Sequence, residues 1–142
     1  MEESKKKIIS QVIITILTFL VAFFGTTYLM SNFNSADKEL NKIAIEINKS
    51  APTMVDKDTR LDNVSVFENT LEYNYTLINI AKDDAGLDLD GAKKFIMKNA
   101  QDNLDNRPEM KDYREKKIAL KYNYKDKNGK QLFDFTVKTN KK

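Results

Sequence analysis

The chain has 142 residues, with 24 Lys and Arg against 21 Asp and Glu, and a net charge of +3 at pH 7. Because charges of both signs are interspersed rather than gathered in a basic stripe, nucleic acid is not expected as a partner. The chain contains neither cysteine nor histidine. This excludes disulfides, thiolate nucleophiles, Ser-His-Asp triads and ordinary zinc sites. We therefore predict no catalytic, cofactor-binding or metal-binding residue.

An uncharged segment from Ile8 to Met30 dominates the N-terminal part of the chain. As a helix it would be about 34 Å long, which is enough to cross a hydrocarbon core of about 30 Å. Lysines occupy positions 5–7, whereas the first basic residue beyond the segment is Lys38. The excess of positive charge before the segment predicts a cytoplasmic tail (1–7), a transmembrane signal anchor (8–30) and an extracytoplasmic domain (31–142).

A cleaved signal peptide is the alternative interpretation of this segment. Its apolar region would be about 7–15 residues long and would end at a small-x-small cleavage site. The apolar run here is longer, and the best site, after Ala36, has Asn34 where a small residue is required. We therefore expect the segment to remain as an anchor.

The first element expected after the anchor is a helix that Ser35 or Asp37 would cap and that ends before Pro52. Its apolar residues recur at helical spacing. They are Leu40, Ile43, Ala44 and Ile47. This stripe favours packing of the helix on the domain.

Residues 59–66 and 71–78 are predicted as two strands of a hairpin, with a turn at 67–70. In the first strand, Val64 and Val66 would share one face while Leu61 falls on the other. In the second strand, the residues of an apolar and aromatic face alternate with Glu72, Asn74, Thr76 and Ile78. Its apolar and aromatic face carries Leu71, Tyr73, Tyr75 and Leu77.

An acidic loop at residues 81–90 precedes a second helix, which Asp88 or Asp90 would cap. One face of this helix carries Ala92, Phe95, Ile96, Ala100 and Leu104. We expect residues 103–107 to interrupt it, and Pro108 to start a short further helix.

A second hairpin is predicted at the C-terminal end, because Asn128-Gly129 readily adopts the positive φ of a tight turn. The strand before it covers residues 118–125, and Phe133, Phe135 and Val137 face inward from the strand after it, with Leu132 as an exception to the alternation. The two hairpins would join in one antiparallel sheet of about four strands, with two or three helices on one face. The predicted fold class is therefore α+β, with the strand order left open.

Two of the predicted strands share the motif L-x-Y-N-Y, at residues 71–75 and 120–124. The four tyrosines are Tyr73, Tyr75, Tyr122 and Tyr124. They form either an aromatic ladder on a half-buried face or an exposed interaction surface. Their alternation in phase with leucine favours the ladder. Arg60 is the fifth candidate for an interaction surface, and its acidic neighbours also allow an ordinary surface ion pair.

Three segments together carry a resemblance. Residues 56–62 read D-x-x-T-R-L-D, residues 73–76 read Y-x-Y-T and residues 122–126 read Y-x-Y-x-D. This combination resembles small exported or membrane-anchored bacterial proteins without an assigned activity. The resemblance implies a bacterial source and an envelope location. Together with the apolar segment and the lysines before it, this predicts a single-pass protein of the bacterial cytoplasmic membrane, with its N-terminus inside and its domain outside. The resemblance implies no catalytic residue.

Function is therefore expected to be binding. One partner would be the lipid bilayer, through Ile8 to Met30, and the other would be a protein. The chain would be an accessory subunit of an envelope or secretion complex, or an immunity-type protein. The alternative is a carboxylate-based enzyme acting on cell-wall glycans, which needs two carboxylates about 5–9.5 Å apart across a cleft. The spacing of the acidic residues Asp56, Asp58, Asp62 and Glu72 does not indicate such a pair.

Overall fold

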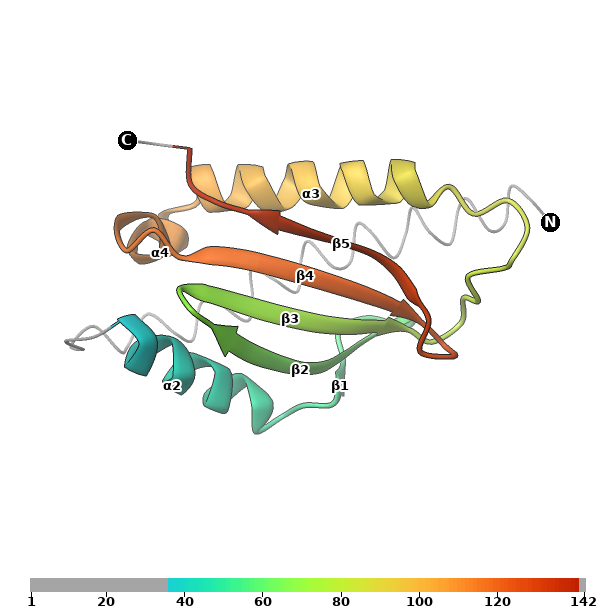
Figure 1. Cartoon of the computed structure of the whole chain (residues 1–142), viewed down its shortest axis with the longest axis horizontal. Helices are drawn as coiled ribbons and strands as arrows, with labels where there is room; N and C mark the ends of the chain where they lie inside the picture. Colours follow the sequence, from blue (N-terminus) through green and yellow to red (C-terminus); the bar gives the residue numbers. More distant parts are fainter. Residues whose placement is uncertain (1–35, 141–142) are drawn as a thin grey trace.

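A computed structural model describes residues 36–140, which form one sheet and its covering helices (Figure 1). The predicted cytoplasmic tail (1–7) and membrane anchor (8–30) lie outside the described residues. Within residues 36–140, no helix is both long enough and apolar enough to cross a bilayer.

The elements follow the predicted order closely. They are α2 (Ala36–Asn48), β1 (Thr53–Met54), β2 (Thr59–Phe67), β3 (Thr70–Leu77), α3 (Leu89–Asn106), η2 (Pro108–Met110), α4 (Lys111–Glu115), β4 (Ala119–Asp126) and β5 (Gln131–Val137). The sheet has five strands in the order β1-β2-β3-β4-β5. This confirms the α+β class. The expected number of strands was too low because β1, only two residues long, pairs with β2.

The central pair of strands is parallel, which corrects the prediction of a fully antiparallel sheet. β3 and β4 run in parallel from Thr70 opposite Ala119 to Leu77 opposite Asp126, whereas the two hairpins are antiparallel as expected. The cause is α3, which carries the chain back along the sheet so that β4 starts at the same end as β3. Parallel strands require such a long crossover.

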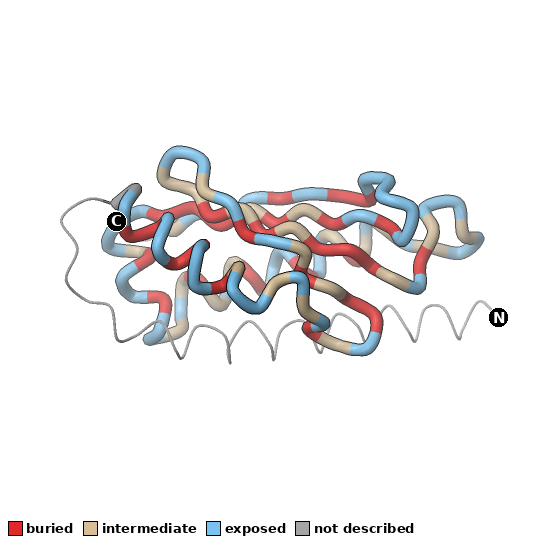
Figure 2. The backbone as a smooth tube through the Cα atoms, turned by 90° about the horizontal axis from the view of Figure 1, so that it is seen from below, coloured by how far each residue is buried: buried red, intermediate tan, exposed pale blue. Residues whose placement is uncertain are grey.

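All the helices that cover the sheet pack on one face of it. The buried residues of α2 and α3 belong to the same core as the inward residues of the strands. They are Leu40, Ile43, Ala44 and Ile47 in α2, and Ala92, Ile96, Ala100 and Leu104 in α3. Phe95 was expected on this stripe but is 46% exposed, because it lies at the margin of the helix face. Buried and exposed residues alternate along the strands (Figure 2).

Two shifts in strand register explain where simple alternation fails. Between Leu61 and Asn63 the pairing of β2 with β3 slips, so that Leu61 and Val64 are both buried in the core. The prediction that Leu61 lies on the opposite face from Val64 was therefore wrong. A second shift, at the start of β5, buries both Leu132 and Phe133.

The boundaries of α3 are set by local hydrogen bonds. Asp88 caps its start, where the Gly91 amide donates to the carboxylate at 2.8 Å. The interruption expected at residues 103–107 is found at its C-terminal limit, where the Arg107 backbone is extended and separates α3 from η2. The helix continues to Asn106, and the Arg107 side chain donates to the Asn103 amide oxygen at 2.9 Å. Pro108 then starts η2, as predicted.

Candidate interaction site

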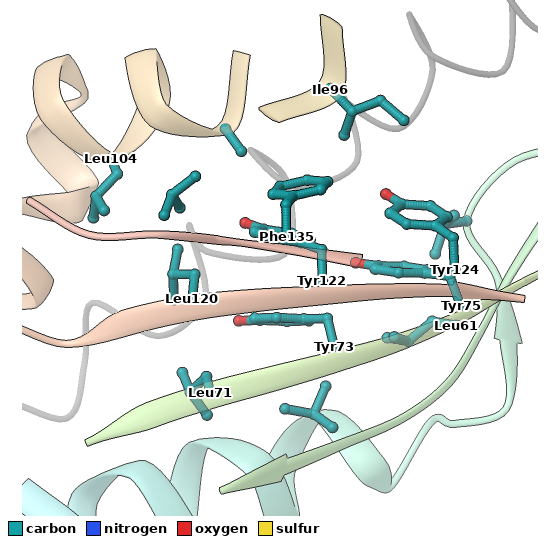
Figure 3. Close-up of a cluster of buried hydrophobic side chains, with 14 of the residues drawn as sticks. Leu61, Leu71, Tyr73, Tyr75, Ile96, Leu104, Leu120, Tyr122, Tyr124 and Phe135 are labelled. Atoms are coloured by element: carbon teal, nitrogen blue, oxygen red, sulfur yellow. The ribbon is translucent and has the colours of Figure 1, made fainter. Parts of the chain in front are cut away.

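The four candidate tyrosines lie in the core, not on the surface. Tyr73 and Tyr75 are each 3% exposed, Tyr122 is 2% exposed and Tyr124 is 0% exposed. The parallel register pairs the two L-x-Y-N-Y motifs residue by residue, so Tyr73 stacks on Tyr122 at 5.5 Å and Tyr75 on Tyr124 at 5.1 Å between ring centroids. The motif is therefore an aromatic ladder, and the idea that these rings form an exposed surface is corrected (Figure 3).

The ladder continues onto β5. Phe135 stacks on Tyr122 at 5.0 Å, and Phe133 lies tilted against Tyr124 at 4.9 Å. Offset stacking of this kind stabilises beyond the area it buries. Burial raises the pKa of both Tyr75 and Tyr124 well above the usual value, and their hydroxyls stay neutral at any physiological pH. The rings thus act as structural core.

The outer side of the sheet is polar and is held in place by hydrogen bonds between strands. Asn63, Asn74 and Asn123 form a row across β2, β3 and β4. The Asn74 amide donates to the Asn63 side-chain oxygen at 2.8 Å, and the Asn123 amide donates to the Asn74 side-chain oxygen at 3.0 Å. This row is an amide ladder on the side opposite the aromatic ladder.

Charged residues flank the amide row on both sides. On one side the Lys121 ammonium donates to a Glu72 oxygen at 2.9 Å, and this bond raises the pKa of Lys121. On the other side, Arg60 Nε donates to Asp62 Oδ1 at 2.6 Å, while the Thr76 hydroxyl donates to Asp62 Oδ2 at 2.6 Å. The fifth candidate residue, Arg60, therefore lies beside the row.

We call this surface the open face. It consists of Arg60, Asp62, Asn63, Glu72, Asn74, Lys121 and Asn123. Asn63 is exposed and the others are half-buried, whereas Thr76, which bonds to Asp62, is buried. Both α2 and α3 bury their apolar stripes against the other side of the sheet, so no helix within residues 36–140 covers it. A contact of Arg60 with a partner stays a prediction.

The polar side chains of the open face are hydrogen-bonded to one another, and no pair of carboxylates is set apart for catalysis among them. The acidic residues considered for glycan cleavage hold structural bonds instead, since Asp56 accepts from the Asp58 and Thr59 amides and Asp58 accepts from Asn79. The described part of the chain contains no group of three acidic, His or Cys residues that could hold a metal ion.

Sequence reasoning missed one structural residue of note, Asp126, whose side chain is fully buried. Its carboxylate accepts from the backbone amides of Lys82, Asn128 and Lys130, each at 2.8 Å. Burial opposes ionisation of this group, but the three amides and the Lys130 charge together lower its pKa. The available signal was its position just before Lys-Asn-Gly, where an aspartate accepts from the amides of the turn.

Comparison with known proteins places the chain in a family. Residues 35–133 match the family described as Domain of unknown function (DUF8479), so the chain belongs to that family. No curated protein matches its sequence.

Two solved structures share the fold. One is a Pseudomonas aeruginosa protein described provisionally as secreted, with a TM-score of 0.59 and 14% identity over 72% of this chain and 88% of that chain. The other is EpsS, the pilotin of the Vibrio vulnificus type 2 secretion system, with a TM-score of 0.56 and 10% identity over 72% of this chain and 86% of that chain. At these identities the likeness shows a common fold.

Proposed function

We propose that the chain is a membrane-anchored accessory protein of a bacterial envelope complex, which binds another protein through the open face. The observation that carries this proposal is the amide row of Asn63, Asn74 and Asn123, flanked by two ion pairs, on a side that no described helix covers. The fold neighbours support the same setting, since one is described as secreted and the other belongs to a secretion system.

The geometry of the open face favours binding for a physical reason. Side chains that already hold hydrogen bonds lose little rotamer freedom when a partner docks. Lys121 and Arg60 are held in this way by Glu72 and Asp62, and both remain partly exposed. A polar surface of this kind selects a partner by complementary charge and hydrogen bonding. The partner's identity would separate an accessory subunit from an immunity-type protein.

Crosslinking from the open face tests the proposal. A photoreactive amino acid replaces Ser65, which is exposed and pairs opposite Glu72 beside the row, in the full chain in cells that make the protein. This probe is expected to capture one reproducible protein. The matched control places the same amino acid at Asn128, in the exposed β4–β5 turn. In the position-65 background, Arg60→Glu should sharply reduce the yield because it replaces the positive charge beside the row. The same set of proteins from both positions, or none from either, would contradict the proposal.

A further inference from the structure

Three segments converge at the end of the domain where α2 begins (Figure 1). Glu39, in the first turn of α2, accepts from the Lys116 ammonium. The Asn69 side chain, in the β2–β3 turn, donates to the carbonyl oxygens of Lys116 at 3.0 Å and Lys117 at 2.9 Å. We call this the proximal end. It comprises the first turn of α2, residues 67–69 and residues 116–117.

An exposed aromatic residue stands at this end. Phe67 is 67% exposed, more than any other large hydrophobic residue that the structure describes. Lys38, Lys116 and Lys117 are exposed on the segments that meet here, and Glu68 follows Phe67 in the turn. Exposure of the Phe67 ring to water is unfavourable. The ring is well suited to a membrane surface, where rings sit at the headgroup level and lysines attract anionic lipids.

The path of the chain brings this end close to the bilayer. The predicted anchor ends at Met30 and α2 starts at Ala36, so five residues, 31–35, separate them. Fully extended, these span at most about 18 Å. The start of α2 therefore cannot be far from the headgroups of an anchored chain, whereas the β4–β5 turn lies at the other end of the strands (Figure 1).

We propose that the proximal end rests on an anionic membrane surface, with Phe67 in the headgroup region and Lys38 and Lys117 beside lipid phosphates. This inference rests on the anchor in the proposed function. It adds the orientation of the domain relative to the bilayer. The strands then lead away from the membrane, and the open face points sideways, within reach of a neighbouring protein in the same membrane.

Site-specific fluorescence tests the orientation. The chain has no cysteine, so Glu68→Cys takes a single polarity-sensitive dye beside Phe67, and Asn128→Cys takes the same dye at the far end as a control. The full chain is reconstituted into vesicles of phosphatidylcholine with and without phosphatidylglycerol. We expect the dye at 68 to be blue-shifted and quenched by headgroup spin labels, more strongly with phosphatidylglycerol, while the dye at 128 reports water.

Two further variants and a flotation assay make the result decisive. In the Glu68→Cys background, Phe67→Ser and Lys117→Glu should each lower the quenching toward that of the dye at 128, with an unchanged circular dichroism spectrum. Vesicles that carry the chain on flotation but leave both dyes equally exposed to water would overturn the orientation and leave the anchor intact. Equal quenching with and without phosphatidylglycerol would overturn the role of the lysines. A chain that does not float with vesicles would overturn the anchor itself.

Discussion

Asp126 is the residue that holds one end of the sheet together. Besides its three amide contacts, the adjacent Lys127 amide donates to the Ile80 carbonyl at 3.0 Å, so that the β4–β5 turn is bonded to the segment that follows β3. The Lys130 ammonium adds a contact to Asp83 at 2.8 Å. A buried carboxylate that accepts several amides favours its ionised form. Stability at this end should therefore depend on pH.

Acid titration of the wild type and Asp126→Asn checks this dependence. Because the pKa of Asp126 is lowered by folding, its contribution is fully present above the unfolded-state value of about 4 and is lost as the pH falls through the folded-state value. Asp126→Asn should melt several degrees lower at neutral pH, since one amide loses its acceptor. It should also lose less stability than the wild type on acidification. Parallel melting curves for the two proteins at every pH would contradict this.

Tyr124 carries a hydroxyl with no hydrogen-bond partner among the described residues. A buried hydroxyl without a partner costs roughly 1–3 kcal/mol, so Tyr124→Phe should leave the free energy of unfolding unchanged or raise it by about 1 kcal/mol. Tyr124→Ala removes the ring and should cost about 3–5 kcal/mol. Urea denaturation measures both. A loss above about 2 kcal/mol in Tyr124→Phe would show that the hydroxyl has a partner after all.

At the scale of elements, the outer edge of β2 is closed by a side chain of α2. The Asn48 amide donates to the Val64 carbonyl at 2.7 Å, and the Val64 amide donates to the Asn48 side-chain oxygen at 2.8 Å. The Asn48 side chain thus makes the two hydrogen bonds to the Val64 backbone that a neighbouring strand would make. Together with β1, which pairs opposite Arg60 and Leu61, it satisfies an edge that would otherwise be open to another chain.

Removal of this contact should weaken the attachment of α2 to the sheet. Asn48→Ala leaves one backbone donor and one acceptor without a partner, and we expect it to lower the free energy of unfolding by about 1–3 kcal/mol. Lys98→Ala, on the exposed side of α3, is the control and should change it by less than about 0.5 kcal/mol. Chemical denaturation of the wild type, Asn48→Ala and Lys98→Ala measures these free energies of unfolding. Equal stability of Asn48→Ala and the control would mean that water replaces the amide.

Whether an element could be predicted from the sequence depended on whether the element itself has one buried face. The alternation of Tyr73 and Tyr75 with polar residues predicted β3 because one of its faces is buried. A strand as short as β1 has no such pattern, since its place comes from pairing with β2. The register shift after Leu61 could not be predicted from the sequence pattern either, because a bulge depends on how the strand pairs with its neighbour.

For the molecule as a whole, the repeated L-x-Y-N-Y motif matches the parallel pairing of β3 with β4. The apolar alternation within each strand does not indicate this pairing. Leu71-x-Tyr73-Asn74-Tyr75 and Leu120-x-Tyr122-Asn123-Tyr124 have the same motif, and each residue faces its equivalent across β3 and β4. Alternation correctly placed the tyrosines inward. It could not show the amide row, because the contacts among Asn63, Asn74 and Asn123 exist only once the strand order and register are known.

Sided labelling of one cysteine tests the extracytoplasmic placement of the binding domain most directly. Asn128→Cys supplies a single thiol in an exposed turn of a chain that has no other cysteine. A membrane-impermeant maleimide is added to spheroplasts before and after the membrane is permeabilised. We predict full labelling in intact spheroplasts, with the chain recovered in the membrane fraction. Labelling only after permeabilisation would place the domain in the cytoplasm and contradict its assignment to an envelope complex.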